Sequence, residues 1–151
     1  MRAVIQRVSW AKVSVDNTVK GEINEGLLVY LGVGKTDEED DIDWLARKIV
    51  NLRIFEDSAG AMNVSVKDKN GEILLISQFT LFGNTKKGTR PSFNDAAPPN
   101  IAEPIYERFI KRVEVELGKA VPTGKFAAMM EVDYVNNGPV TIIIDSKMRG
   151  F

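Results

Sequence analysis

The stretch "SVKDKNGEILLISQFTLFG", residues 65–83, decides the fold class. Asn70-Gly71 is a strong signal for the turn of a β-hairpin, and apolar residues dominate on its C-terminal side. We therefore predict a β-hairpin here, whose second strand stays apolar until polar side chains appear near its end. The flanking sequence then decides whether strands alone, or strands and helices, build the domain.

Further strands are predicted on both sides of this hairpin. Apolar residues alternate over residues 3–15 and 27–33, and a short strand is expected at residues 52–57. Two more strands, rich in Val, Ile and Thr, are expected at residues 129–135 and 140–146.

Two helices are predicted between these strands. The first starts at a T-x-x-E capping box formed by Thr36 and Glu39. Its apolar face is expected to carry Ile42, Leu45, Ile49 and Leu52. The second starts at Asn100 with Glu103 three residues on, and stops at Gly118. Its apolar positions are Ile105, Phe109, Val113 and Leu117. With no internal repeat and no linker, we predict one α/β domain over residues 1–151.

The composition is that of an ordinary globular protein, with 44% hydrophobic and 27% charged residues and a net charge of -1. No apolar run is long enough for a membrane span, and the charged, alternating start "MRAVIQRVSWAKVSV" is unlike a signal peptide. Without cysteine there is no disulfide framework that would favour secretion. We therefore expect a cytoplasmic protein without a membrane partner.

The chain contains no histidine and no cysteine. This excludes a Ser-His-Asp triad, a Cys-His nucleophile and histidine-based zinc sites, so we expect no metal and no cofactor. Catalysis, if there is any, must use hydroxyls, carboxylates, lysines, main-chain dipoles or the substrate itself.

Two stretches imitate known ligand sites. "LLVYLGVGKT" ends like a phosphate-binding P-loop, but Val29 stands where the motif requires glycine. The acidic run "DEEDDID", residues 37–43, lacks the glycine and the spacing of a calcium-binding EF-hand. Acidic residues at a helix N-terminus complement the helix dipole, and this is the interpretation we adopt.

Two polar groups of residues are candidates for a site. Ser77, Gln78 and Thr80 interrupt an apolar strand, where they would polarise or position a substrate carbonyl, or else merely mark the end of the strand. The loop "NTKKGTRPSF" brings three basic residues close to an aromatic ring. These residues are Lys86, Lys87, Arg90 and Phe93. Phosphate contact with base stacking and a solvated basic loop explain this loop equally well.

Gly138-Pro139 opens the last strand. Proline cannot donate to a sheet ladder, so it occurs at edges, bulges or strand starts, and taken alone the pair predicts only a turn. Together, however, "SQFTLFG", "KKGTRPSF" and "NNGPVT" resemble signatures of the D-aminoacyl-tRNA deacylases. The similarity extends from "MRAVIQRV" to the last strand. Two positions depart from the pattern: Met129 and Asn137 stand where aspartate is frequent in the family.

The resemblance implies a homodimer of mixed β-sheets forming a barrel-like layer with helices packed on one side. It implies binding of the aminoacylated 3′ end of tRNA and hydrolysis of the ester that joins a D-amino acid, or glycine mischarged on tRNA-Ala, to the terminal adenosine. A cis Gly138-Pro139 peptide would enter the partner's active site and reject L-substrates. There it would face Ser77, Gln78, Phe79 and Thr80.

The mechanism we expect is main-chain catalysis. Amides around Gln78 and Phe79 would stabilise the oxyanion, Thr80 would orient the ester or the water, and the ribose 2′-hydroxyl would activate that water. Phe79 would also line the adenosine site. Two alternatives stay open: Thr80 as a covalent nucleophile, and a non-catalytic RNA-binding module built on Phe79, Phe93 and the basic loop.

Overall fold

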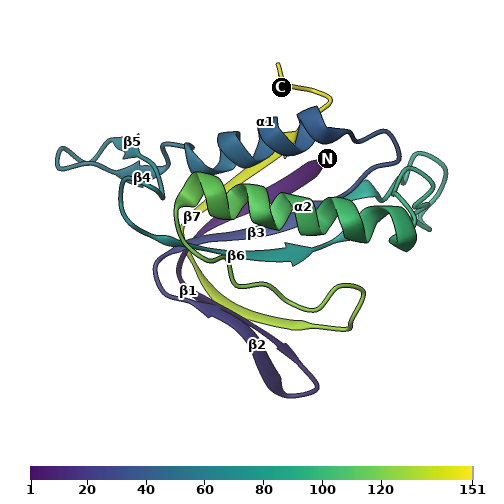
Figure 1. Cartoon of the computed structure of the whole chain (residues 1–151), viewed down its shortest axis with the longest axis horizontal. Helices are drawn as coiled ribbons and strands as arrows, with labels where there is room; N and C mark the ends of the chain where they lie inside the picture. Colours follow the sequence, from purple (N-terminus) through teal and green to yellow (C-terminus); the bar gives the residue numbers. More distant parts are fainter. Residues whose placement is uncertain (151) are drawn as a thin grey trace.

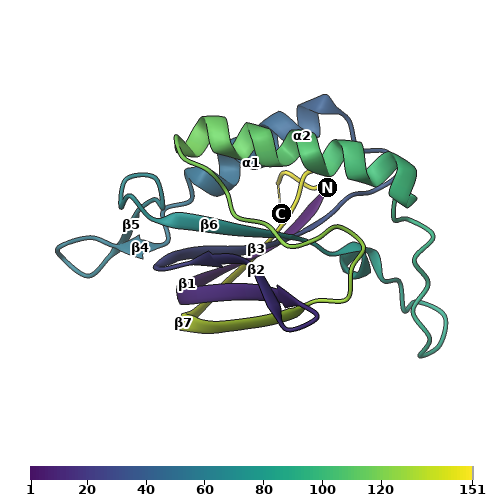
Figure 2. The same ribbon diagram turned by 60° about the horizontal axis from the view of Figure 1, so that its bottom comes forward.

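A single curved sheet with two helices on one face makes up the computed structural model, which describes residues 1–150 (Figure 1). Phe151, the last residue of the expected domain, lies outside the described residues. The sheet contains the strands β1 (Arg2–Val15), β2 (Thr18–Ile23), β3 (Gly26–Gly32), β6 (Glu72–Ser77) and β7 (Glu131–Asp145). A separate two-stranded sheet joins β4 (Phe55–Glu56) to β5 (Met62–Val64), and Figure 2 shows it projecting from the body of the molecule.

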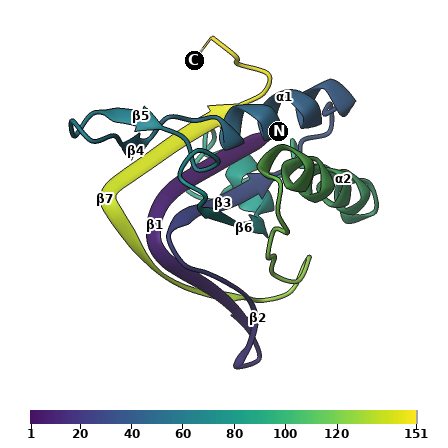
Figure 3. The same ribbon diagram turned by 60° about the vertical axis from the view of Figure 1, so that its left-hand side comes forward.

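The long strand β1 organises the sheet. On one side its first half pairs antiparallel with β3 and its second half with β2, while β7 runs antiparallel along its other side. The order β2-β1-β3-β6 is completed by a parallel pairing of β3 with β6. The sheet curls strongly, with β7 following β1 around the bend (Figure 3). The predicted fold class is confirmed: a mixed sheet forms a half-barrel, and both helices pack on one side.

Both helices exist, but each begins at a different residue from the one predicted. Helix α1 spans Glu39–Val50, and the amide of Glu38 donates to Asp41 Oδ2 at 2.9 Å, so the start at Thr36 is wrong. Helix α2 spans Pro99–Leu117, one residue before the predicted cap at Asn100. Proline suits the first helical turn, because its missing N–H would have no partner there. The predicted stop at Gly118 is confirmed, with φ of 81°.

The central strands are buried on both faces. Leu27, Val29 and Leu31 of β3 point into the core beneath the two helices. Leu28 of β3 and Ile76 of β6 point the other way, into a smaller core closed by the curled ends of β1 and β2. A parallel pair buried on both faces has an almost continuous apolar sequence, as "EILLIS" does.

The predicted hairpin at residues 65–83 is wrong. Residues 65–71 form a turn, with Asn70 at φ of 57°. The strand before this turn, β5, pairs with β4 and not with β6. Instead β6 pairs with β3, because that register buries its apolar residues on both faces. The two strands predicted at residues 129–135 and 140–146 are one continuous strand, β7.

Lys147, which follows β7, forms an ion pair with Asp41 at the start of α1. Lys147 Nζ and the Glu38 amide donate to Asp41 Oδ2 at 2.6 and 2.9 Å. Burial alone would raise the pKa of Asp41, but these hydrogen bonds outweigh it and lower the pKa from 3.8 to about 2. The residues that follow β7 are thereby fastened to the helical layer.

Asp41→Asn should destabilise the folded protein by about 2 kcal/mol at pH 7, since each unit of pKa shift is worth about 1.4 kcal/mol. The pKa is depressed in the folded state, so this stabilisation is complete above about pH 4 and is lost as the pH falls through about 2. Urea unfolding of both proteins from pH 7 downward measures it. A difference in unfolding free energy that does not shrink with falling pH would contradict this assignment.

Candidate active site

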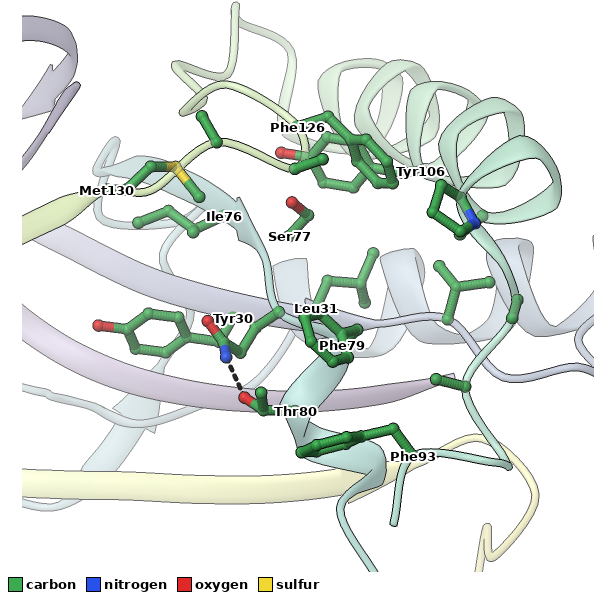
Figure 4. Close-up of a pocket in the computed structure, with 18 of the residues that line it drawn as sticks. Tyr30, Leu31, Ile76, Ser77, Phe79, Thr80, Phe93, Tyr106, Phe126 and Met130 are labelled. Carbon is green, nitrogen blue, oxygen red and sulfur yellow. Dashed lines mark hydrogen bonds between the residues drawn. The ribbon is translucent and has the colours of Figure 1, made fainter. Parts of the chain in front are cut away.

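A cavity of about 580 Å³ opens where β3 and β6 end beside the start of α2. Its volume is in the range of small-molecule sites. The residues that line it are Tyr30, Leu31, Val33, Ile76, Ser77, Gln78, Phe79, Thr80, Phe93, Ala96, Ala97, Pro98, Pro99, Ala102, Tyr106, residues 126–130 and Val132. None of these side chains carries a charge. Figure 4 shows Ser77 pointing into this space, between the ring of Phe79 and the pair Tyr106 and Phe126.

The chain changes direction at the cavity. Strand β6 ends at Ser77, and the 3-10 helix η1 (Phe79–Phe82) follows, so the predicted strand alternation holds only up to Ser77. Phe79 is 58% exposed, whereas Phe82 is buried beneath the guanidinium of Arg2, which lies 4.6 Å from its ring centre. Phe82 therefore anchors the turn that presents Phe79 and Thr80 at the cavity.

Two polar groups of this turn already form hydrogen bonds within the protein. The Gln78 amide donates to the carbonyl of Leu31 at 2.7 Å, so it is not free to bind an oxyanion, contrary to our expectation. The Gln78 side chain donates to the hydroxyl of Thr80 (Figure 4). Phe79 stands at the first position of η1, where a helical N–H has no intrahelical acceptor.

Aromatic side chains stand on both sides of Ser77. Phe79 meets Phe93 edge-to-face, with ring centres 5.1 Å apart. Tyr106 and Phe126 lie 5.7 Å apart, and the Tyr106 hydroxyl donates to the carbonyl of Leu75 at 3.2 Å. This wall of rings and small residues suits a flat, uncharged group such as a nucleobase.

The ionisable groups that line the cavity remain neutral at physiological pH. Burial, with the neighbouring Tyr134, raises the pKa of Tyr30 to about 12. Burial, with the charge of Glu107, raises the pKa of Tyr106 as well. Within residues 1–150 no group of three or more His, Cys, Asp or Glu side chains gathers as a metal site. The lining therefore offers dipoles and orientation, without a side-chain base.

The basic residues predicted to contact RNA lie beside the cavity. Asn84 and Ser92 close the base of their loop through backbone hydrogen bonds of 2.7 and 2.9 Å. Lys86, Lys87 and Arg90 are exposed beyond this closure. Of the predicted cluster only Phe93 reaches the cavity. A ligand bound along the loop would therefore meet the cavity at the ring of Phe93.

The Gly138–Pro139 pair lies elsewhere on the surface. Its peptide is cis, as expected, both residues are exposed, and neither lines the cavity. Gly138 has φ of 122°, a conformation that favours glycine. Opposite β1, Thr141 pairs with Gln6 and Asn136 with Val8, so residues 137–140 bulge out against Arg7 alone.

Arg7 is a residue at this bulge that we did not predict. Its side chain is buried, and its Nη1 donates to the carbonyl of Ile54 at 2.8 Å. Within the described residues its Nε has no hydrogen-bond partner. An alanine Cβ at Gly138 would come within 3.4 Å of Arg7 Nη2. An arginine in an alternating strand gives no sequence signal for this placement, because most such side chains are solvated.

Comparison with known proteins assigns the chain to a family. The sequence profile of the D-Tyr-tRNA(Tyr) deacylase family matches residues 4–145. The chain belongs to this family. It is similar to two proteins named D-aminoacyl-tRNA deacylase. The one from Thermotoga petrophila is 58% identical over 97% of each chain, and the one from Flavobacterium psychrophilum is 55% identical over 99% of each.

Two solved structures share the fold of this family member. One, described as a c-Myc DNA unwinding element binding protein, is 41% identical with a TM-score of 0.89, and the match covers 96% of this chain and 98% of that one. The other, described as a probable eukaryotic D-amino acid tRNA deacylase, is 18% identical with a TM-score of 0.81 over 95% and 97% of the two chains. At that identity the second match supports the fold alone. Within residues 1–150 no helix is long and apolar enough to cross a membrane.

Proposed function

We propose that this protein is a D-aminoacyl-tRNA deacylase, which hydrolyses the ester between a D-amino acid and the 3′-terminal adenosine of tRNA. The observation that carries the proposal is the uncharged cavity at the end of β6, bordered by Ser77, Gln78, Phe79 and Thr80 in a chain of this family. Aminoacyl-tRNA is made in the cytoplasm, and we place the enzyme there, as one domain over residues 1–151 with no cofactor.

The lining favours main-chain catalysis. An aminoacyl ester is already activated, so water can add to its carbonyl without a strong protein base. The oxyanion that forms would be stabilised by the Phe79 amide, because the Gln78 amide is already bonded to Leu31. The bond to the ribose oxygen then breaks, and that oxygen takes up the proton released by the water. The neighbouring ribose hydroxyl is the group that we assign to activate the water.

Thr80 in this mechanism positions the substrate. Its hydroxyl accepts a hydrogen bond from Gln78, which holds it in place at the cavity. Thr80→Ala should therefore keep measurable deacylation, reduced about 10- to 100-fold, as expected when one orienting group is removed. Rapid-quench kinetics should show no burst of acyl-enzyme. A trapped acyl adduct on Thr80 of the parent enzyme would establish the nucleophile alternative instead.

The tRNA would approach along the basic loop. Lys86, Lys87 and Arg90 are exposed and free to contact phosphates, while Phe93 and Phe79 offer rings at the mouth of the cavity. Phosphate contacts fix position and are weakened by salt, whereas stacking on the rings places the terminal adenosine. We assign the adenosine to the aromatic part of the cavity on this basis.

A second copy of the chain would complete the site. The bulge at Gly138–Pro139 faces outward from β7, which is an edge strand with exposed apolar residues such as Val135 and Ile143. In a homodimer, this bulge would enter the partner's cavity. Its carbonyls would bind the α-amino group of the substrate and occupy the space needed by an L side chain.

This geometry separates substrates by configuration at the α-carbon. A side-chain pocket recognises one particular side chain, whereas a main-chain filter at the α-carbon accepts many D-amino acids. Glycine has no side chain to exclude, so glycyl-tRNA, including tRNA-Ala mischarged with glycine, should also be hydrolysed. Proofreading of aminoacyl-tRNA is the role that follows.

Loss of the ester from D-tyrosyl-tRNA, measured with the purified protein in the presence and absence of EDTA, tests this function. We expect rapid hydrolysis in both conditions. Strict loss of activity with EDTA, restored by a divalent ion, would refute the metal-free mechanism. Tight nucleic-acid binding without ester loss would favour the binding-module alternative, in keeping with the description of the 41% identical structure.

A further inference from the structure

The base of the Gly138–Pro139 bulge is held by one side chain, that of Asn136. Asn136 is the last residue of β7 that pairs with β1 before the bulge, and Thr141 is the first that pairs after it. The four residues between them have only Arg7 opposite on β1. A bulge of this size leaves main-chain groups that the sheet ladder cannot satisfy.

The Asn136 carboxamide supplies the missing hydrogen bonds. Its Nδ2 donates to the carbonyl of Arg7 at 3.0 Å and to that of Val140 at 3.1 Å, and so joins the two sides of the bulge. Its Oδ1 accepts from Gln6 Nε2 at 3.3 Å and from Thr141 Oγ1 at 3.4 Å. Both donor hydrogens and both acceptor sites of the amide are therefore used.

This arrangement fixes the orientation of the amide. A flipped carboxamide would direct its oxygen at two carbonyls, so only one orientation satisfies all four partners. The two carbonyls belong to the residue opposite the bulge and to the residue directly after Pro139. Their separation is therefore set by the Asn136 side chain.

We propose that Asn136 is a positioning residue that sets the placement of Gly138–Pro139, and with it the D/L selectivity of the enzyme. The inference rests on the proposed function, in which this bulge enters the partner's cavity. If the Asn136 amide is lost, the two sides of the bulge are free to move apart. The main chain that excludes L-substrates would then no longer occupy a defined position.

Asn136→Asp tests the proposal with the smallest change of shape. The carboxylate keeps the size of the side chain but replaces the donor group with an oxygen that repels the carbonyls of Arg7 and Val140. We expect kcat/KM for D-tyrosyl-tRNA to fall about 100-fold, as for a misplacement of about 1 Å at a reacting centre. The ratio of D- to L-tyrosyl-tRNA hydrolysis should also fall, at least about 10-fold.

Asn17→Asp is the matched control. It makes the same chemical change at an exposed side chain in the turn between β1 and β2, which belongs neither to the bulge nor to the cavity. We expect activity and D/L ratio within about twofold of the parent, because surface substitutions have small effects. A partly unfolded variant loses activity on both stereoisomers in proportion, so a fall in the D/L ratio separates positioning from folding.

Thr141→Val provides a second variant should Asn136→Asp not fold. It removes the hydroxyl that donates to Asn136 Oδ1 and keeps the shape, so the D/L ratio should fall by a smaller factor. A parent enzyme without preference for D over L would refute the proposed filter itself. A selective parent, together with an Asn136→Asp or Thr141→Val variant of unchanged D/L ratio, would overturn the role of Asn136 alone.

Discussion

Gly138→Ala is expected to lower the hydrolysis of D-aminoacyl-tRNA about 100-fold, as for a reacting group misplaced by about 1 Å. An added Cβ would come within 2.6 Å of the Val140 amide nitrogen and 2.7 Å of Val140 Cγ2, at a φ of 122° that disfavours L side chains. The bulge must shift to relieve these contacts. The substitution therefore acts on the backbone of its own chain as well as on the partner's cavity. The measurement is kcat/KM with D-tyrosyl-tRNA.

Gly60→Ala is the control for a substitution at positive φ. Gly60, in the turn between β4 and β5, has φ of 81°, and an added Cβ would meet nothing within 4 Å. It should cost about 1–2 kcal/mol of stability, the penalty for a left-handed L-residue, and leave kcat/KM unchanged. Equal activity of the Gly138 and Gly60 variants would show that the bulge takes no part in the reaction.

Ala102→Trp is expected to lower the hydrolysis of D-aminoacyl-tRNA about 100-fold or more, because the substrate must be oriented in the cavity. Ala102 lies on α2 one turn before Tyr106, and both line the cavity. An indole at this position would fill the space between α2 and η1. The overpacking should cost about 1–3 kcal/mol of stability, which thermal unfolding would record.

Val115→Trp is the matched control on the same helix. Val115 is 73% exposed and lies far along α2 from the cavity. Its replacement should leave both stability and hydrolysis close to those of the parent. Normal turnover by a folded Ala102→Trp protein would show that the substrate binds outside the cavity.

Mixing the two inactive variants tests whether the bulge acts on the partner. In a mixed dimer, the Gly138→Ala chain brings an intact cavity and the Ala102→Trp chain brings an intact bulge. With free exchange of subunits, one site in two of each mixed dimer, or about a quarter of all sites, should regain activity. No recovery after verified exchange would place the bulge and the cavity in the same chain.

The fold class was predictable because it depends on periodic burial. Residues 3–15 alternate as strands do, and the apolar faces of both helices follow helical spacing. Residues 27–33 form an almost continuous apolar run instead, which is typical of a strand buried on both faces. The pairing of β6 was not predictable. Asn70-Gly71 is a local hairpin signal, but the tertiary core buries β6 on both faces beside β3, and this burial outweighs the turn preference.

The site was predictable as far as its motifs extend. Ser77, Gln78, Phe79, Thr80 and Phe93 do meet at the cavity, whereas the direction of the chain after Ser77 was predicted wrongly. That turn is set by the tertiary anchoring of Phe82 beneath Arg2, which strand alternation cannot reveal.

The remaining residues of the site carry no chemical signature in sequence. Ala96, Pro98 and Ala102 line the cavity only because they are small and lie where the loop enters α2. Arg7 and Asn136 reach the bulge through a shift in strand register. Such placements follow from the assembled sheet, so local patterns could not have identified them.

The most direct test of the account compares the two stereoisomers on the same nucleic acid. D-tyrosyl-tRNA and L-tyrosyl-tRNA, prepared on one tRNA, are incubated with equal amounts of purified protein, and the remaining ester is followed with time. We predict rapid loss of the D-tyrosyl ester, while the protein hydrolyses the L-tyrosyl ester far more slowly. Equal hydrolysis of both esters, or of neither, would contradict the account.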